Sequence, residues 1–112
     1  MRRMVLLLTT ALLLAAGCGS EHDSTEPSDD ATVSMPGFSF TPYATTIKVG
    51  GSVTFDFPAE SHNVIFEKIS GAPTDIQETV NREVSRTFPV AGTFPYDCTI
   101  HPGMSGVVQV VR

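Results

Sequence analysis

Short runs of alternating apolar and polar residues begin at Val33 and continue to the end of the chain. In the segment 52–57, apolar side chains occupy every second position, and Ser, Thr or Asp occupies the positions between them. This period of two is typical of a strand with one buried face. Shorter apolar runs at 38–40, 47–49 and 107–111, separated by prolines and glycines, predict further strands. Regularly spaced short strands predict an all-β sandwich or barrel.

The segment from Thr74 to Val84 fits two structures. Ile76, Val80 and Val84 recur at the spacing of one helix face. The segment also fits a long connection between strands, and its pattern does not decide between the two.

The first residues carry an export pattern instead of a strand pattern. Arg2 and Arg3 precede an apolar run from Val5 to Ala16. That run is shorter than the roughly 20 residues that a membrane-spanning helix needs. A basic start followed by a short apolar run is typical of a signal peptide. We therefore predict that residues 1–17 are a signal peptide and that the protein is exported.

Cys18 follows the sequence Leu14-Ala15-Ala16-Gly17, which resembles a bacterial lipobox with its leucine one position early. We predict that Cys18 is lipidated and anchors the exported protein on the periplasmic or extracellular face of a bacterial membrane. The alternative is an ordinary signal peptide cleaved nearby, which would leave Cys18 as a free thiol.

Residues 18–33 are predicted to be a disordered acidic tether. Between Gly19 and Thr32 the chain has five acidic residues and no bulky apolar residue. Such a composition buries too little surface to offset the entropy of ordering, and its charges repel one another. The folded domain is then expected to span residues 34–112, and a bound metal would help to stabilise so small a core.

The charge balance argues against nucleic-acid binding. The formal net charge is −5, and the chain has no cluster of Lys or Arg beyond Arg2 and Arg3. Proteins that bind nucleic acids need clustered cations to replace the counterions of the phosphates. We therefore expect protein partners, with the membrane contacted through the lipid alone.

Cys98 is left without a cysteine partner if Cys18 carries a lipid. An unpaired thiol outside the cytoplasm is open to oxidation unless something occupies its sulfur. Cys98, His101 and Met104 lie three residues apart. Three residues of extended chain cover roughly 10 Å, so these side chains can bind one ion only if the segment curls tightly. A proline and a glycine at positions 102 and 103 favour such a turn.

His62 is the candidate for a fourth ligand, since it is the one other histidine in the predicted domain. It shares a strand face with Val64 and Phe66, and Cys98 shares one with the aromatic residues at positions 94 and 96. Both faces are therefore expected to point inward. Two imidazoles, one thiolate and a weak thioether are the ligands of a blue-copper electron-transfer site. Taken singly, these side chains also fit structural roles, as an ordinary histidine, a packed methionine or an inert thiol.

Several segments together resemble the plastocyanin family of cupredoxins. The resemblance covers nearly all of the chain after the tether, and the two residues between successive ligands make the loop similar to that of amicyanin. The segments are Phe40-Thr41-Pro42, Ile47-Lys48-Val49-Gly50, Val53-Thr54-Phe55, His62-Asn63-Val64, Gly92 to Tyr96 and Cys98 to Val110. The family implies an all-β Greek-key sandwich of about eight strands, with one copper ion per chain at one end.

The resemblance also implies roles for residues around the copper. Asn63 is expected to stiffen the site, with its backbone N–H reaching toward the Cys98 sulfur. The ring edge of His101 is expected at the surface, within an apolar patch where redox partner proteins dock. The candidate patch residues are Met35, Pro36, Pro102 and Gly103. Residues 57–61, which precede the first histidine ligand, depart from the family pattern.

These features predict a monomeric carrier of single electrons between redox partners at the cell envelope. No acid, base or nucleophile is obviously placed for catalysis, so we do not expect an enzyme. Copper delivery or storage is the alternative, because the same ligands would serve it. A third possibility is a metal-free adhesive or structural β-sandwich. Zinc is a further candidate for these ligands, since Cys and His bind it well.

Overall fold

The computed structural model describes residues 27–112, and these residues form seven β-strands. The predicted signal peptide, Cys18 and the first part of the predicted tether lie outside the described residues. Within residues 27–112, no helix is long and apolar enough to cross a membrane. The strands are β1 (Ser28–Ser34), β2 (Ala44–Phe57), β3 (His62–Phe66), β4 (Ile76–Thr79), β5 (Arg82–Thr87), β6 (Gly92–Asp97) and β7 (Ser105–Val111).

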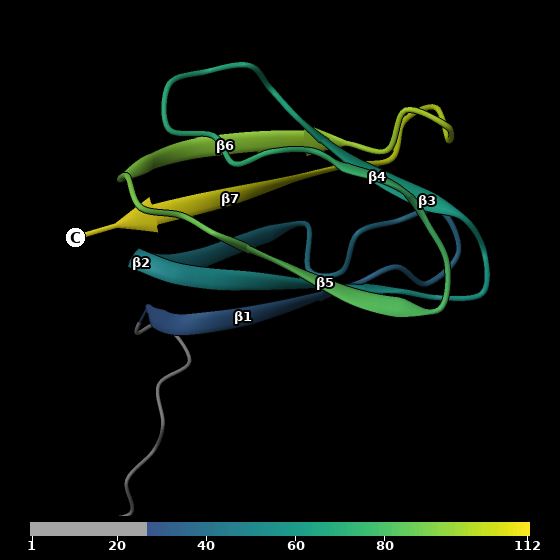
Figure 1. Ribbon diagram of the computed structural model, residues 1–112, viewed down its shortest axis with the longest axis horizontal. Coiled ribbons are helices and arrows are strands. Elements are labelled where there is room, and N and C mark those ends of the chain that lie inside the picture. The colour runs from purple at the N-terminus through teal and green to yellow at the C-terminus, as the bar shows by residue number, and fades with distance from the viewer. Residues whose placement is uncertain (1–26) are drawn as a thin grey trace, which may run out of the picture.

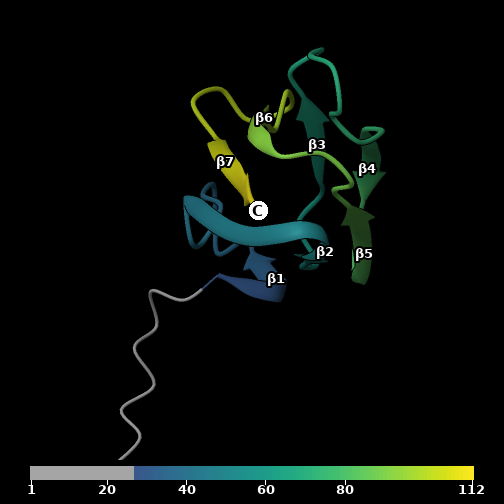
Figure 2. The same ribbon diagram turned by 90° about the vertical axis from the view of Figure 1, so that its left-hand side faces the viewer.

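β2 joins two layers of strands, and this makes the fold a sandwich. Its first half, residues 44–48, pairs in parallel with β7 and belongs to the layer that continues through β6 and β3 to β4. Its second half, residues 52–57, lies between β1 and β5. Figures 1 and 2 show β6 and β7 on one side and β1 on the other. The predicted all-β sandwich is confirmed, and β2, with its 14 residues, takes the place of two shorter strands.

β2 passes from one layer to the other at Gly50 and Gly51. Gly50 has a φ of 85°, a backbone conformation that glycine adopts without strain. A Cβ on Gly51 would lie 2.1 Å from the carbonyl oxygen of Asp29, so only a glycine lets β1 pass this closely. The two glycines therefore allow one strand to serve both layers.

β1 changes the predicted start of the domain. The sequence predicts a disordered tether up to residue 33, but residues 28–33 belong to β1, which pairs in parallel with β2. Most side chains of this segment are exposed, whereas Val33 is fully buried. Backbone hydrogen bonds to β2 hold the segment in place, and its polar composition does not reveal them. The prediction of disorder is therefore wrong for residues 28–33, and the folded domain begins at Ser28.

Residues 74–84 form neither a helix nor a plain connection. β4 pairs with β3 in one layer and β5 pairs with β2 in the other, so the chain crosses the sandwich between them. Asn81 has a φ of 49° at this crossing. Ile76 is buried whereas Val80 is 46% exposed, so the helical spacing of these residues does not mark one buried face.

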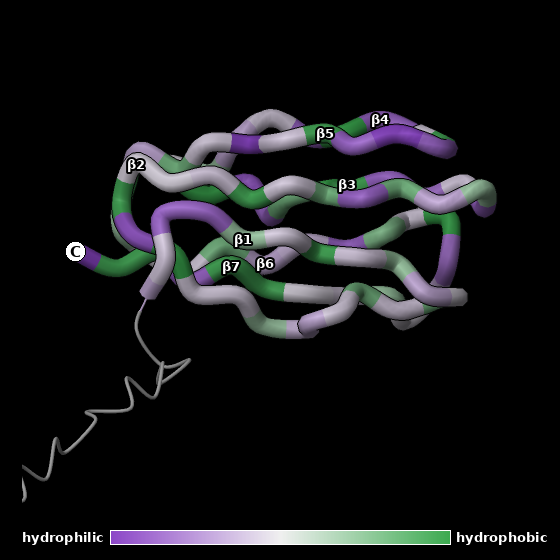
Figure 3. Tube along the Cα trace, turned by 90° about the horizontal axis from the view of Figure 1, so that it is seen from below, coloured by the Kyte–Doolittle hydropathy of each residue, from purple (hydrophilic) through white to green (hydrophobic). Residues whose placement is uncertain are grey.

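The core is dominated by aromatic side chains around Tyr96. Its ring packs edge-on against three phenylalanines, with centroid distances of 4.8 Å to Phe40, 5.3 Å to Phe55 and 5.7 Å to Phe66. Gly106 lies against this ring, because a Cβ there would come within 2.4 Å of Tyr96 atoms. Figure 3 shows hydrophobic and hydrophilic residues alternating along the strands, so that each layer offers one apolar face. This packing fixes the end of β6, immediately before the candidate ligand loop.

Candidate metal centre

Three donor atoms converge at one end of the sandwich. His62 begins β3, Cys98 follows β6, and His101 lies in the loop before β7, at the right of Figure 1. The Nδ1 atoms of the two imidazoles are 3.1 Å apart. The sulfur of Cys98 lies 3.9 Å from Nδ1 of His62 and 3.4 Å from Nδ1 of His101. The structure thus brings together three of the four predicted ligands.

These distances fit a single metal ion. A point equidistant from three atoms separated by 3.1, 3.4 and 3.9 Å lies about 2.0 Å from each of them. Imidazole nitrogens bind zinc at about 2.0–2.1 Å and thiolates at about 2.3 Å, which sets the scale for a divalent ion. An ion would therefore lie close to the plane of the three donors, as the trigonal His₂Cys arrangement of blue-copper sites requires.

His62 is fully buried and suited to act as a neutral donor. Burial lowers the pKa of His62, and the neighbouring His101 lowers it further, against an opposing effect of Glu60. The neutral ring is therefore favoured, and it offers the nitrogen lone pair that a metal needs. Its Nε2 atom is buried and has no hydrogen-bond partner within residues 27–112, so Nδ1 carries all of the ring's polar contacts there.

The loop from Cys98 to Met104 is closed by its own backbone. The Cys98 N–H donates to the carbonyl of Met104 at 2.9 Å, and the Met104 N–H donates to the carbonyl of His101 at 3.2 Å. Gly103 has a φ of 83°, which suits the turn between them. The ligand spacing predicts this curl. Met104, the predicted weak fourth ligand, is 2% exposed at the end of the loop.

Asn63 stiffens the loop through its side chain. Its Oδ1 accepts a hydrogen bond from the Thr99 N–H at 2.8 Å, and its Nδ2 donates to Oγ1 of Thr99 at 2.8 Å. Two bonds from one amide therefore clamp the residue that follows Cys98. The sequence does not predict this role for Thr99. The signal was that polar residues follow two predicted ligands directly, Asn63 after His62 and Thr99 after Cys98. The contact expected between the Asn63 backbone N–H and the Cys98 sulfur stays a prediction.

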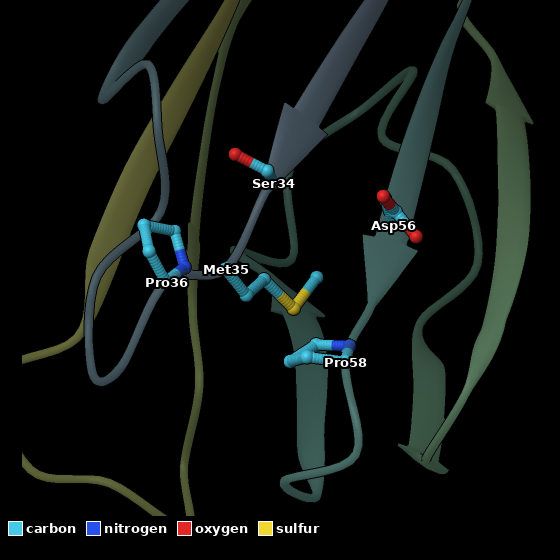
Figure 4. Close-up of a pocket in the computed structure, with 5 residues that line it drawn as sticks. All are labelled: Ser34, Met35, Pro36, Asp56 and Pro58. Atoms are coloured by element: carbon cyan, nitrogen blue, oxygen red, sulfur yellow. The ribbon is translucent and has the colours of Figure 1, made fainter.

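The predicted apolar patch needs one correction. Pro36, Pro102 and Gly103 are exposed at the end of the sandwich that holds the metal centre, but Met35 is only 2% exposed. Met35 lies two residues after Val33 and continues the inward-facing side of β1. Its side chain points toward Pro58 and helps to line a pocket of about 230 Å³, shown in Figure 4. The prediction that Met35 belongs to the exposed patch is therefore wrong.

Phe38 takes the place at the surface that was expected for Met35. Its side chain is 64% exposed, and its ring centroid lies 4.8 Å from that of His101, with the rings tilted by 54°. Phe38, His101 and Pro102 line a second pocket of about 260 Å³. The sequence pattern predicts that Phe38 lies in a strand, but the structure places it in a loop. Pro36 and Gly37 could have indicated this loop, because both favour turns and Gly37 has a φ of 63°.

A carboxylate also reaches the outer edge of the centre. Oε1 of Glu60 lies 3.6 Å from Nε2 of His101, and the two side chains are 51% and 20% exposed. Glu60 belongs to the segment 57–61, for which the sequence predicts no role. The imidazole of His101 therefore has one nitrogen beside the Cys98 sulfur and the other beside a charged surface group.

The chain matches copper proteins in sequence. A family model described as copper binding proteins of the plastocyanin/azurin family matches residues 28–111. Amicyanin-alpha of Methylorubrum extorquens is 34% identical over 105 residues, which cover 90% of this chain and 87% of that protein.

Solved structures agree with the sequence comparison. The amicyanin of Paracoccus versutus is 28% identical with a TM-score of 0.62, over 77% of this chain and 85% of that chain. A copper-containing nitrite reductase from Thermus scotoductus is 28% identical with a TM-score of 0.63, but the match covers 78% of this chain and 23% of that enzyme. With most of its length matched by the family model, this chain belongs to the plastocyanin/azurin family of copper binding proteins.

Proposed function

We propose that this protein carries single electrons by means of one copper ion held by His62, Cys98, His101 and Met104. The observation that carries the proposal is the convergence of two imidazole nitrogens and one thiol sulfur within 3.1–3.9 Å of one another. Copper supplies the electron chemistry, because thiolate and thioether ligands stabilise Cu(I) while imidazoles suit both oxidation states. The similarity to amicyanins supports the same function.

The protein holds the donors in place before and after each electron. His62 and Cys98 are buried, so neither can turn toward water. The Asn63–Thr99 bonds and the backbone bonds of residues 98–104 restrict the ligand loop. A site whose donors cannot move needs little rearrangement between oxidation states, and this favours fast electron transfer.

Electrons are proposed to enter and leave through the ring of His101. This side chain is the one candidate ligand that reaches the surface, where it is 20% exposed. It is bordered by Phe38 and Pro102, which with Pro36 and Gly103 form the surface that we call the electron port. A small apolar surface of this kind suits weak, short-lived contacts with redox partner proteins.

We propose no enzymatic activity for this chain. Amicyanins and a pseudoazurin resemble this chain over most of their length, and none of these proteins is described as an enzyme. The likeness to a nitrite reductase spans 23% of that enzyme, so its activity does not transfer to this chain.

The protein is proposed to work outside the cytoplasm. The support is the signal-peptide pattern of residues 1–17 and the lipobox-like sequence that ends at Cys18. A lipid on Cys18 would anchor a monomer to a bacterial membrane, on the periplasmic or extracellular face, through the part of the acidic tether that precedes Ser28.

The test is the visible absorption and EPR spectrum of the purified protein with Cu(II). We expect an intense blue thiolate-to-copper band and a narrow parallel hyperfine splitting. Cys98→Ala should lose the band, and Cys18→Ser should keep it, because only one of the two cysteines belongs to the centre. A colourless wild-type protein, or a band that survives in Cys98→Ala, would contradict the proposal.

The same preparation separates an electron carrier from a copper-delivery protein. A carrier should keep its copper through repeated oxidation and reduction in the presence of a Cu(I) chelator. The buried, preassembled donors favour this outcome over release. Loss of the copper to the chelator during the first reductions would favour delivery instead.

A further inference from the structure

Glu60 places a fixed negative charge at the electron port. It lies in the short connection between β2 and β3, and its Oε1 atom is 3.6 Å from Nε2 of His101. The same ring has its Nδ1 atom 3.4 Å from the Cys98 sulfur. One imidazole therefore separates the buried donors from a carboxylate at the surface.

We propose that Glu60 determines which partners the port accepts, by selecting proteins that present a Lys or Arg side chain at the rim of an apolar surface. The inference rests on the proposed electron-carrier function and names the chemistry of its partner. A partner with an acidic rim would face like-charge repulsion at the position where the two proteins must come closest.

Glu60 is free to make such a contact. Its side chain is 51% exposed, and within residues 27–112 its carboxylate lies 3.6 Å from the His101 ring and is paired with no lysine or arginine. By contrast, the carboxylate of Asp75 is already paired with Lys68 at 2.6 Å. A cation from another protein would therefore give the Glu60 carboxylate the opposite charge that residues 27–112 do not supply.

Neighbouring charges leave this rim negative. Ser61 donates a hydrogen bond to Oε1 of Glu78, so a second carboxylate lies beside the same connection. Arg82 is the nearest basic residue by strand pairing, because it lies opposite Phe57 across β2 and β5. Two further exposed carboxylates, those of Asp56 and Glu83, face each other at the next pair of β2 and β5. Among residues 27–112, Glu60 is the carboxylate that lies beside the His101 ring.

Apolar side chains on the other side of His101 strengthen the effect. Phe38 packs against the His101 ring, and Pro102 lines the same pocket. When a partner covers these residues, water leaves the contact and the interaction between charges at its rim grows. The electron port therefore combines an apolar surface, which can pack against different partner proteins, with one negative charge. That charge favours partners with a cation at the rim of the contact over partners with a carboxylate there.

The test measures electron-transfer rates of the copper-loaded protein with two small complexes of opposite charge. Hexaammineruthenium(II), a cation, reduces the Cu(II) form, and ferricyanide, an anion, oxidises the Cu(I) form. At low salt, Glu60→Gln should react about fourfold more slowly with the dication and about eightfold faster with the trianion than wild type, as expected for charges of +2 and −3 roughly 10 Å from a unit charge in water. Near 1 M salt the differences should disappear, because screening acts within about 3 Å.

Two variants serve as controls. Glu67→Gln removes the same charge from an exposed position just past the far end of β3 and should alter both rates much less. Glu60→Asp keeps the charge and should keep most of the discrimination. The reduction potential of each variant is measured as well, because a higher potential in Glu60→Gln would by itself speed reduction by the cation and slow oxidation by the anion, which is the reverse of the expected result.

The outcomes separate this inference from the proposed function. If wild-type protein lacks the blue band, the proposed function fails before any rate is measured. If the band is present but Glu60→Gln and Glu67→Gln change the rates equally, net charge and not Glu60 sets the preference, and the inference is overturned. Loss of the band in Glu60→Gln would also overturn it, since the residue would then be part of the centre's structure.

Discussion

The Asn63 side chain shows how one amide can hold a ligand loop. It bonds both the backbone N–H and the hydroxyl of Thr99, each at 2.8 Å, and it is 8% exposed. Asn63 follows His62 directly, and Thr99 follows Cys98 directly. The amide therefore ties the strand that supplies one imidazole to the loop that supplies the thiolate.

Asn63→Ala is expected to lower the free energy of unfolding by about 1–3 kcal/mol, because its two hydrogen bonds to Thr99 are lost at about 0.5–1.5 kcal/mol each. Urea denaturation of the copper-loaded protein measures the loss. Thr99→Ala removes only the hydroxyl bond and should cost less. In a double-mutant cycle the two changes should not be additive, and additive costs would show that the side chains act independently.

At the scale of elements, Asp75 ties the long connection between β3 and β4 to its neighbours. Its Oδ1 accepts a hydrogen bond from the Phe66 N–H at 2.9 Å and another from Nζ of Lys68 at 2.6 Å. Nη2 of Arg86, on β5, donates to the Asp75 carbonyl at 2.9 Å. Burial alone would raise the pKa of Asp75, but the hydrogen bonds from Lys68 and Phe66 outweigh it and lower the pKa below its usual value.

The pH dependence of stability follows from that shift. A carboxyl whose pKa is depressed in the folded state adds stability above its unfolded pKa of 3.8, and this stability is lost as the pH falls through the folded value. Asp75→Asn should therefore unfold more easily than wild type at pH 7, and the gap should shrink below pH 3.8. Denaturation of both proteins from pH 7 to pH 2.5 tests it. A gap that stays constant over this range would show that the charge of Asp75 is not involved.

Elements defined by local pattern could be predicted from the sequence, and those defined by distant pairing could not. The alternation in 52–57 predicts the second half of β2, and the spacing of Cys98, His101 and Met104 predicts a curled loop, since both are properties of short segments. β1 is held by its pairing with β2, which no pattern within residues 28–33 reveals. The exposure of Phe38 likewise depends on how the preceding turn lies against the His101 ring.

At the scale of the whole molecule, the proposed copper ion would link parts of the chain that are far apart in sequence. His62 begins β3, whereas Cys98 and Met104 flank the loop between β6 and β7. A ligand that binds only the folded state stabilises it in proportion to the logarithm of its concentration over its dissociation constant. The small size of the domain makes such a contribution large relative to the total.

Removal of copper by a chelator should therefore lower the Tm. At a free copper concentration about 100 times the Kd, the expected difference is roughly 10–20 °C for a domain of this size. Calorimetry of the copper-loaded and copper-free forms measures it. Cys98→Ala, which lacks the thiolate, should respond to copper far less. Equal Tm values for the two wild-type forms would mean that the ion does not cross-link the fold.

The direction of β1 determines which way an anchored molecule faces. Its first residue, Ser28, pairs with Ile47, whereas its last residue, Ser34, pairs with Asp56 near the metal-binding end. Seven extended residues span about 20 Å, so the chain enters the domain at the pole remote from His101. If the N-terminus is attached to a membrane, the His101 end of the domain would therefore point away from that membrane. It could then meet soluble electron donors and acceptors while the protein stays attached.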